Sequence, residues 1–174
     1  MSRFIVVTGG ARSGKSRLAE SRVAELAPGG PWLYIATAEA GDDEMRARIA
    51  QHQRRRGDDW RTVEAARDVA AALARDVGDA RAVLIDCATL WLSNRMFDGL
   101  TDDAILAEAD TIAAVARAAA VPVLLVTNEV GAGIVPDNPV ARRFRDLAGW
   151  VNQRVAGVAD EVVLVACGLP LRLR

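Results

Sequence analysis

The sequence has few of the residues that define whole classes of protein. It contains only two cysteines, Cys87 and Cys167, which lie far apart in apolar runs. This spacing gives no support for a disulfide framework or a CxxC metal site. No apolar run reaches the roughly 18 residues that a membrane helix needs, and the N-terminus lacks the apolar core of a signal peptide. We therefore expect a cytoplasmic protein with no membrane span.

Aromatic residues and net charge are also scarce. Aromatic residues make up 5% of the chain and the formal net charge is -1. A near-neutral chain lacks the broad basic surface that binds nucleic acids or anionic membranes, so we expect no nucleic-acid partner. With 51% hydrophobic and 26% charged residues, the composition is that of a globular protein with an aliphatic core. The length suits one domain, and without a linker or repeat we predict a single domain over 1–174.

Strand-like and helix-like segments alternate along the chain. Apolar runs without period-two alternation, typical of strands covered on both faces, lie at 4–9, 32–37, 82–87, 121–128 and 161–166. Segments with helical spacing lie at 16–26, 42–56, 66–77, 101–120 and 138–159. The alternation predicts an α/β fold with a mostly parallel sheet flanked by helices. Functional residues should then gather at the carboxyl ends of the strands.

The first strand is followed directly by GGARSGKS, residues 9–16, which matches GxxxxGK[ST] between a strand and a helix. Glycines let the backbone N–H groups curl around a phosphate, and the helix N-terminus adds positive potential. Of the 22 basic residues, Lys15 alone is a lysine. A compact charge suits the outer phosphates, and the Ser16 hydroxyl can bind Mg²⁺. The segment predicts a P-loop NTPase.

Polar residues end two other predicted strands. Asp86 follows AVLI, where a carboxylate can hold the Mg²⁺ of a bound nucleotide. Capping of the next segment is the other interpretation, and the phosphate loop favours the magnesium role. Asn128 and Glu129 follow the fourth predicted strand, where a contact with substrate and a structural turn are both open.

The sequence has one histidine, His52, within RIAQHQRRR. On the helix predicted there, it lies on the same stripe as Met45 and Ile49, flanked by arginines. A metal ligand is disfavoured because no second histidine exists. Two interpretations stay open from the residues alone: a partly buried histidine at a helix end, and a nucleophile that the arginines keep neutral beside a triphosphate.

Several segments together resemble the bifunctional adenosylcobinamide kinase/adenosylcobinamide-phosphate guanylyltransferases of cobalamin synthesis, the CobU family. They are GGARSGKS, YIATA, DDEMRARIAQHQRRR, VLIDCATLWLSN and VTNEVGAGIVPDNPVARRFRDLAGWVNQRVA, and the resemblance extends to GLPL at 168–171. It implies a RecA-like P-loop domain that forms homotrimers. It also implies two reactions: ATP or GTP phosphorylates adenosylcobinamide, and GTP then gives its guanylyl group to adenosylcobinamide-phosphate.

The resemblance also implies roles for particular residues. His52 corresponds to a guanylyl-histidine. The phosphate loop and the strand end, rather than the resemblance, predict Lys15 as the second catalytic residue and Ser16 and Asp86 as Mg²⁺ ligands. Glu64 would bind the base or ribose of GTP. The implied nucleotide contacts are Gly9, Gly10, Ala11, Arg12, Ser13, Gly14, Lys15, Ser16, Ala36, Thr37, Ala38, Gln53, Arg54, Arg55, Arg56, Glu64 and Asp86.

Two other functions compete with this one. The first is a P-loop small-molecule kinase in which His52 only binds phosphate, and the second is a RecA-like ATPase, which the near-zero charge disfavours. A corrinoid would need a broad apolar surface. Candidates for it, with core packing equally open for each, are Trp91, Met96, Phe97 and Trp150.

Overall fold

The computed structural model describes residues 3–39 and 56–174, whose strands form one seven-stranded sheet in the order β3-β2-β4-β5-β1-β6-β7. The first six strands in this order run parallel, and β7 pairs antiparallel with β6. The strands are β1 Phe4–Gly9, β2 Trp32–Ala36, β3 Trp60–Glu64, β4 Ala82–Asp86, β5 Val123–Val126, β6 Glu161–Ala166 and β7 Leu169–Arg172.

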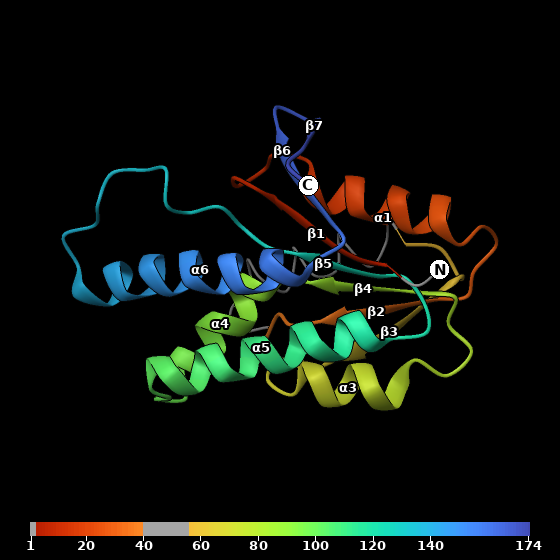
Figure 1. Ribbon diagram of the computed structural model, residues 1–174, viewed down its shortest axis with the longest axis horizontal. Helices are drawn as coiled ribbons and strands as arrows, with labels where there is room; N and C mark the ends of the chain where they lie inside the picture. Colours follow the sequence, from red (N-terminus) through yellow and green to blue (C-terminus); the bar gives the residue numbers. More distant parts are fainter. Residues whose placement is uncertain (1–2, 40–55) are drawn as a thin grey trace.

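Helices cover both faces of the sheet, as parallel strands require. In Figure 1, α1 lies on one face, and α3, α4, α5 and α6 lie on the other. The helices are α1 Lys15–Leu26, α3 Val69–Asp76, α4 Ala88–Phe97, α5 Asp102–Ala118 and α6 Pro139–Val158. The predicted mostly parallel α/β fold is confirmed. Within the described parts of the chain, no helix is long and apolar enough to cross a membrane.

Two apolar cores lie on opposite faces of the sheet, and β1 contributes to both. Phe4 and Val6 belong to the larger core beneath α3 to α6, whereas Ile5 and Val7 belong to the core beneath α1. All four side chains are at most 1% exposed. The strand is therefore apolar at every position because each face is covered, which is why it shows no alternation.

Three elements were not predicted. β3 is a short edge strand of polar and aromatic residues, WRTVE, most of whose side chains are exposed, so it lacks the apolar run of a buried strand. α4 begins at Ala88, directly after Cys87, and its Thr, Ser and Asn residues weaken the helical pattern. β7 is exposed along its length. The predicted helix at 42–56 falls almost wholly outside the described residues.

The register of the sheet brings several candidate residues to one edge. Ala36 at the end of β2 pairs with Glu64 of β3 on one side and with Asp86 of β4 on the other. Asp86 in turn pairs with Val126 of β5. Since parallel strands end at the same edge, these positions share that edge with the loop after β1.

Candidate functional site

The loop between β1 and α1 leads into the N-terminus of α1. Gly14, at the N-cap of α1, has a φ of 95°, in the left-handed region that favours glycine. Among the described residues, no side chain caps the helix there. Because the first N–H groups of a helix lack intrahelical partners and carry positive potential, this geometry suits a phosphate group.

Gly9 has no room for a side chain. A Cβ at this position would lie 2.4 Å from the carbonyl oxygen of Val165 in β6 and 2.7 Å from Ser13 Oγ. The Ser13 hydroxyl is buried and makes no hydrogen bond with the described residues. A buried hydroxyl without a partner is uncommon, and a ligand oxygen would satisfy it.

Lys15 is 8% exposed, which is unusual for a charged side chain. Its Nζ donates a hydrogen bond to the carbonyl oxygen of Gly10 over 3.0 Å, so the amine lies against the loop. Burial of an ammonium group costs free energy that a nearby anion offsets. The position is therefore suited to bind phosphate oxygens.

Two distant segments hold the loop by backbone hydrogen bonds. The amide of Glu129, after β5, donates to the Gly9 carbonyl over 3.1 Å. The amide of Gly168, in the turn between β6 and β7, donates to the Ser13 carbonyl over 3.0 Å. The role of Gly168 was missed at the level of sequence, although it lies in the GLPL segment that carries the resemblance.

Asp86 is half-buried at the end of β4. Its Oδ2 accepts a hydrogen bond from the Tyr34 hydroxyl over 3.1 Å. Tyr34 lies on β2, the neighbouring strand, and is 5% exposed. Tyr34 was not among the predicted site residues, because only the pairing of β2 with β4 brings it to Asp86.

Arg56 is the first described residue after position 55, and it packs on Tyr34. Its guanidinium carbon lies 3.4 Å from the centre of the Tyr34 ring, a cation–π contact. One of its nitrogens, Nη1, is buried and has no hydrogen-bond partner among the described residues. This nitrogen could therefore donate to a bound ligand.

Thr37 joins the end of β2 to the start of the segment after β4. Its hydroxyl donates to the Cys87 carbonyl over 2.8 Å and accepts from the Cys87 amide over 2.7 Å. The Asn94 side chain of α4 donates to the carbonyls of Thr37, over 2.9 Å, and Ala66, over 3.0 Å. Thr37 is fully buried, so its side chain supports the backbone of the 36–38 segment rather than reaching solvent.

The other predicted contacts after β2 and β3 lie at the same edge. Ala36 and Ala38 are half-buried, and Glu64 is exposed at the end of β3. Glu64 is the last residue of β3, and α3 follows five residues later. Its exposed carboxylate beside Ala36 can accept hydrogen bonds from a ligand.

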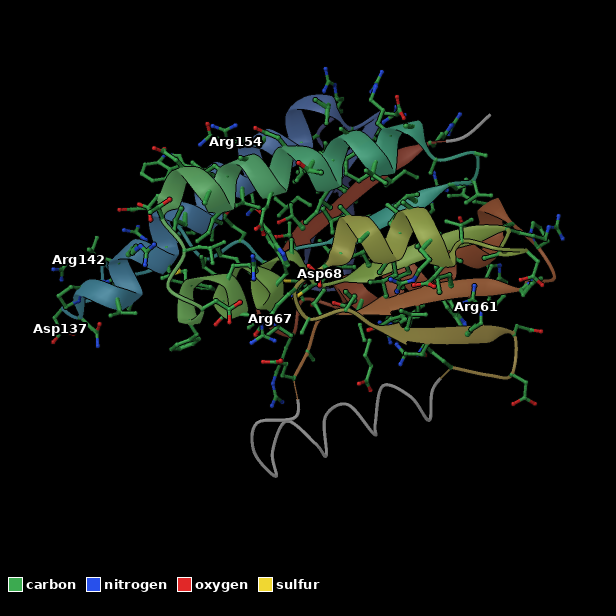
Figure 2. All side chains as sticks on the ribbon, turned by 90° about the horizontal axis from the view of Figure 1, so that it is seen from below. Arg61, Arg67, Asp68, Asp137, Arg142 and Arg154 are labelled. Atoms are coloured by element: carbon green, nitrogen blue, oxygen red, sulfur yellow. The ribbon has the colours of Figure 1, made fainter. Side chains whose placement is uncertain are left out.

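The loop after residue 64 is tied to α4 by charge pairs. Arg67 forms ion pairs with Glu39 and with Asp98, and Arg95 also pairs with Asp98. Hydrogen bonds from Arg67 hold the pKa of Asp98 below its usual value. Figure 2 shows Arg67 on the underside of the molecule, whereas Asp137 and Arg142 lie away from it, at the N-terminal end of α6.

Four of the predicted site residues cannot be placed. His52, Gln53, Arg54 and Arg55 lie outside the described residues. Their assignments stay predictions.

Asn128 and Glu129 are both engaged in local structure. Asn128 Nδ2 donates to Thr89 Oγ1 over 2.6 Å, and Asn152 of α6 donates to the Asn128 carbonyl over 3.0 Å. Glu129 Oε1 accepts from the Gly131 amide over 2.6 Å, which closes a turn. These contacts support the structural interpretation of the pair.

Two buried groups beside Asp86 have raised pKa values. Burial, and next the charge of Asp86, raise the pKa of the Cys87 thiol to about 11. Burial and the Asp86 charge likewise raise the pKa of Tyr34 above its usual range. Both groups therefore stay protonated near neutral pH, and Tyr34 acts as a hydrogen-bond donor.

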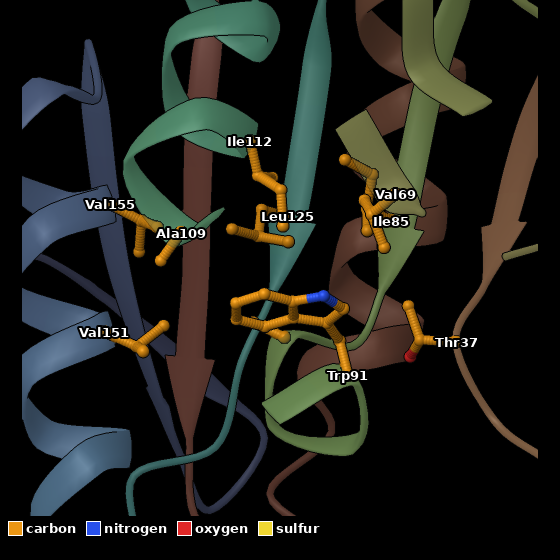
Figure 3. Close-up of a pocket in the computed structure, with 10 residues that line it drawn as sticks. Thr37, Val69, Ile85, Trp91, Ala109, Ile112, Leu125, Val151 and Val155 are labelled. Carbon is orange, nitrogen blue, oxygen red and sulfur yellow. The ribbon is translucent and has the colours of Figure 1, made fainter. Parts of the chain in front are cut away.

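The candidate corrinoid residues have different environments. Trp91 is 1% exposed and lines a cavity of about 10 Å³ with Ile85, Leu125 and other core residues (Figure 3), so of its two open interpretations the structure supports core packing. Met96 packs against the same core. Phe97 and Trp150 are 83% and 47% exposed, and they remain candidates.

Comparison with known proteins gives the family. The model for cobinamide kinase / cobinamide phosphate guanyltransferase matches residues 5–173. This chain belongs to that family. The bifunctional adenosylcobalamin biosynthesis protein CobU of Escherichia coli K12 is 41% identical, with 98% of this chain and 99% of the relative covered. CobU of Salmonella typhimurium is 44% identical with the same coverage, and CobP of Pseudomonas aeruginosa is 43% identical, with 97% and 96% covered.

A solved structure shows the same fold. The KaiC-like protein of Pyrococcus horikoshii superposes with a TM-score of 0.57 at 16% identity, over 93% of this chain and 70% of that protein. At this identity the likeness concerns the fold alone. It confirms the predicted RecA-like P-loop fold of this cobinamide kinase / cobinamide phosphate guanyltransferase family member.

The residues at the sheet edge suit Mg²⁺ bound together with a nucleotide. Asp86 presents a half-buried carboxylate whose Oδ1 makes no hydrogen bond with the described residues, and Ser16 supplies a hydroxyl at the start of α1. Mg²⁺ characteristically takes one or two such protein oxygens and completes its shell with phosphates and water. No group of three or more His, Cys, Asp or Glu side chains in the described part of the chain forms a metal site by itself. The donor set therefore fits a metal carried by the nucleotide.

Proposed function

We propose that this chain phosphorylates the hydroxyl of the aminopropanol arm of adenosylcobinamide with ATP or GTP, and then guanylylates the product. In the second reaction GTP transfers GMP to adenosylcobinamide-phosphate, which gives adenosylcobinamide-GDP and pyrophosphate. The observation that carries the proposal is the family match over residues 5–173, together with a phosphate loop and Asp86 at one edge of the sheet.

In the phosphorylation step, this chain holds and orients the triphosphate. The amides of Gly9 to Ser16 and the amine of Lys15 bind its phosphate oxygens, and Ser16 and Asp86 hold Mg²⁺. Bound Mg²⁺ would offset the negative charge on the phosphates. Lys15 offsets the charge that develops as the terminal phosphoryl group leaves, and its burial strengthens this interaction.

In the guanylyl transfer, His52 is the proposed nucleophile. A neutral imidazole nitrogen attacks the α-phosphorus of GTP, the bond to the β-phosphate oxygen breaks, and pyrophosphate leaves. A phosphate oxygen of adenosylcobinamide-phosphate then attacks the same phosphorus, and the imidazole is released. Arg54, Arg55 and Arg56 would steady the phosphates, and Glu64 would contact the base or ribose.

Labelling with GTP tests this covalent step. With GTP labelled at the α-phosphate, the parent protein should retain acid-labile, alkali-stable label after denaturation, whereas GTP labelled at the γ-phosphate should leave none. His52→Ala should not be labelled. Equal labelling of His52→Ala would show that the nucleophile is another residue.

A product assay separates the bifunctional enzyme from a plain kinase. Adenosylcobinamide with ATP and GTP should give adenosylcobinamide-GDP and pyrophosphate. A protein that accumulates only adenosylcobinamide-phosphate would be a small-molecule kinase. Lys15→Ala should abolish the phosphorylation of adenosylcobinamide, and retained phosphorylation would remove the phosphate loop from that mechanism.

We also propose that the chain works as a cytoplasmic homotrimer that binds no nucleic acid. Exposed apolar side chains near the start of α6 support self-association: Ile134 is 97% exposed and Val140 is 60% exposed. In Figure 1 the segment before α6 and the start of that helix extend away from the sheet. Light scattering that gives the mass of one chain, 18.6 kDa, would contradict the trimer.

A further inference from the structure

One tyrosine links the proposed magnesium carboxylate to the rest of the site. The Tyr34 hydroxyl donates to Asp86 Oδ2 over 3.1 Å, and this bond joins side chains of the neighbouring strands β2 and β4. Tyr34 is the only tyrosine in the chain, at 5% exposure. A buried hydroxyl and a half-buried carboxylate therefore meet at the edge where the strands end.

The Tyr34 ring is fixed on two sides. The Trp60 ring of β3 meets it edge-on, with ring centres 6.2 Å apart and planes inclined by 79°. The Arg56 guanidinium carbon lies 3.4 Å from the Tyr34 ring centre. A ring held in this way has one orientation, and its hydroxyl stays directed at Asp86.

The bond occupies one carboxylate oxygen and leaves the other available. Oδ2 accepts the tyrosine proton, while Oδ1 makes no hydrogen bond with the described residues. A carboxylate held at one oxygen presents the other in a fixed direction. Such a partner of a metal ligand typically changes metal affinity by 10- to 100-fold when it is removed.

We propose that Tyr34 is a positioning residue that orients Asp86 so that its other oxygen binds the magnesium ion of the nucleotide. The inference rests on the proposed function, since it takes Asp86 as a metal ligand. In this role Tyr34 acts through Asp86 and not by its own contact with the nucleotide or the metal. Its effect should therefore appear in metal affinity rather than in nucleotide binding without metal.

Tyr34→Phe tests the proposal because it removes the hydroxyl and keeps the ring between Trp60 and Arg56. The control is Trp32→Phe, two residues earlier on β2, which removes the hydrogen bond from Trp32 Nε1 to the Ala27 carbonyl within the same aromatic cluster. Binding of Mn²⁺ in the presence of a non-hydrolysable GTP analogue can be followed by electron paramagnetic resonance. The affinity of each protein for the same analogue is also measured in EDTA, where no metal is available.

The expected result is a roughly tenfold weaker Mn²⁺ affinity for Tyr34→Phe, with unchanged affinity for the analogue in EDTA. Trp32→Phe should bind Mn²⁺ as the parent does. Phosphorylation by Tyr34→Phe should recover as Mg²⁺ is raised, a rescue that a general loss of structure would not show.

The outcomes distinguish a failure of the Tyr34 role from a failure of the Asp86 assignment. If the parent and Tyr34→Phe bind Mn²⁺ equally well, the role of Tyr34 is wrong and the metal site stands. If the parent with the analogue binds no Mn²⁺, the assignment of Asp86 in the proposed function falls, and the role of Tyr34 falls with it. An equal loss in Trp32→Phe would show a structural effect of the cluster and overturn the positioning role.

Discussion

Gly9 lies so close to Val165 that a Cβ on Gly9 would stand 2.4 Å from the Val165 carbonyl oxygen. That oxygen belongs to the backbone of β6, which is paired with β1 on one side and β7 on the other, so moving it would disturb the sheet. Gly9→Ala should therefore destabilise the fold by about 1–3 kcal/mol through overpacking. Urea unfolding measures the change.

Gly10 is the matched control, because a Cβ there would meet no atom of the described residues within 4 Å. Gly10→Ala should unfold at nearly the same urea concentration as the parent, whatever its effect on nucleotide binding. Equal stability of the two variants would mean that the loop moves freely against β6.

Lys15 should not tolerate arginine, although arginine supplies every other basic side chain of the sequence. The residue is 8% exposed and its amine lies 3.0 Å from the Gly10 carbonyl oxygen, so a larger planar guanidinium would have to displace its buried surroundings. Lys15→Arg should lower phosphorylation of adenosylcobinamide at least about 100-fold, equivalent to about 3 kcal/mol of transition-state stabilisation. Radiolabelled phosphate transfer measures it.

Arg17, exposed in the first turn of α1, gives the control. Arg17→Lys makes the reverse exchange on the same helix and should leave the rate near that of the parent. A Lys15→Arg variant that retains most of the activity would show that the site needs a positive charge but not a compact one.

The phosphate loop could be predicted from the sequence because its geometry is local. Eight consecutive residues and the flanking strand and helix determine it, and the glycine conformation at Gly14 follows from the motif. The position of Asp86 in the site could also be predicted, since a polar residue after a buried strand marks the edge of the sheet where functional residues gather. Family membership and fold followed from patterns distributed over the whole chain.

Contacts between strands could not be predicted, because they depend on strand order. Nothing in the pattern of apolar runs says that β2 lies between β3 and β4, and that arrangement brings Tyr34 to Asp86 and Glu64 beside Ala36. β3 was not predicted because it is an edge strand. Most of its side chains are exposed, so its sequence lacks the apolar run of a strand that is covered on both faces. The location of Trp91 could not be predicted either, since a large aromatic residue suits a core and a binding surface equally.

The two cysteines should differ sharply in reactivity. Cys87 is buried and its pKa is raised to about 11, whereas Cys167 is exposed. Because the thiolate is the reactive form, a thiol reagent at pH 7.5 should modify one cysteine in the folded protein and both after unfolding. Cys167→Ser should abolish labelling of the folded protein. Rapid modification of Cys87 in that variant would contradict its burial.

The raised pKa of Cys87 also predicts loss of stability at alkaline pH. Above the ordinary thiol pKa of about 8.5, the unfolded chain releases a proton that the native state keeps. The unfolded state then binds fewer protons, so the free energy of unfolding falls as pH rises from about 8.5 towards 11, by at most about 1.4 kcal/mol per pH unit. Unfolding of Cys87→Ala between pH 7.5 and 9.5 should show a shallower decline. The same slope in both proteins would contradict the prediction.

Asn94 joins the ends of two strands, and its amide can be tested by two substitutions. Its Nδ2 donates to the carbonyls of Thr37 and Ala66, next to the proposed nucleotide contacts. Asn94→Ala leaves both acceptors without their donor and should cost about 1–3 kcal/mol of unfolding free energy. Asn94→Asp should cost more at pH 8, because a carboxylate would face two carbonyl oxygens.

Acid should partly rescue Asn94→Asp, since a protonated carboxyl group can donate a hydrogen bond again. The gap in unfolding free energy between Asn94→Asp and Asn94→Ala should therefore narrow from pH 8 to pH 5, while the gap between Asn94→Ala and the parent stays constant. Urea unfolding at the two pH values measures both gaps. If Asn94→Asp is as stable as the parent at pH 8, the amide does not hold these carbonyls, and the segments after β2 and β3 must be positioned by other contacts.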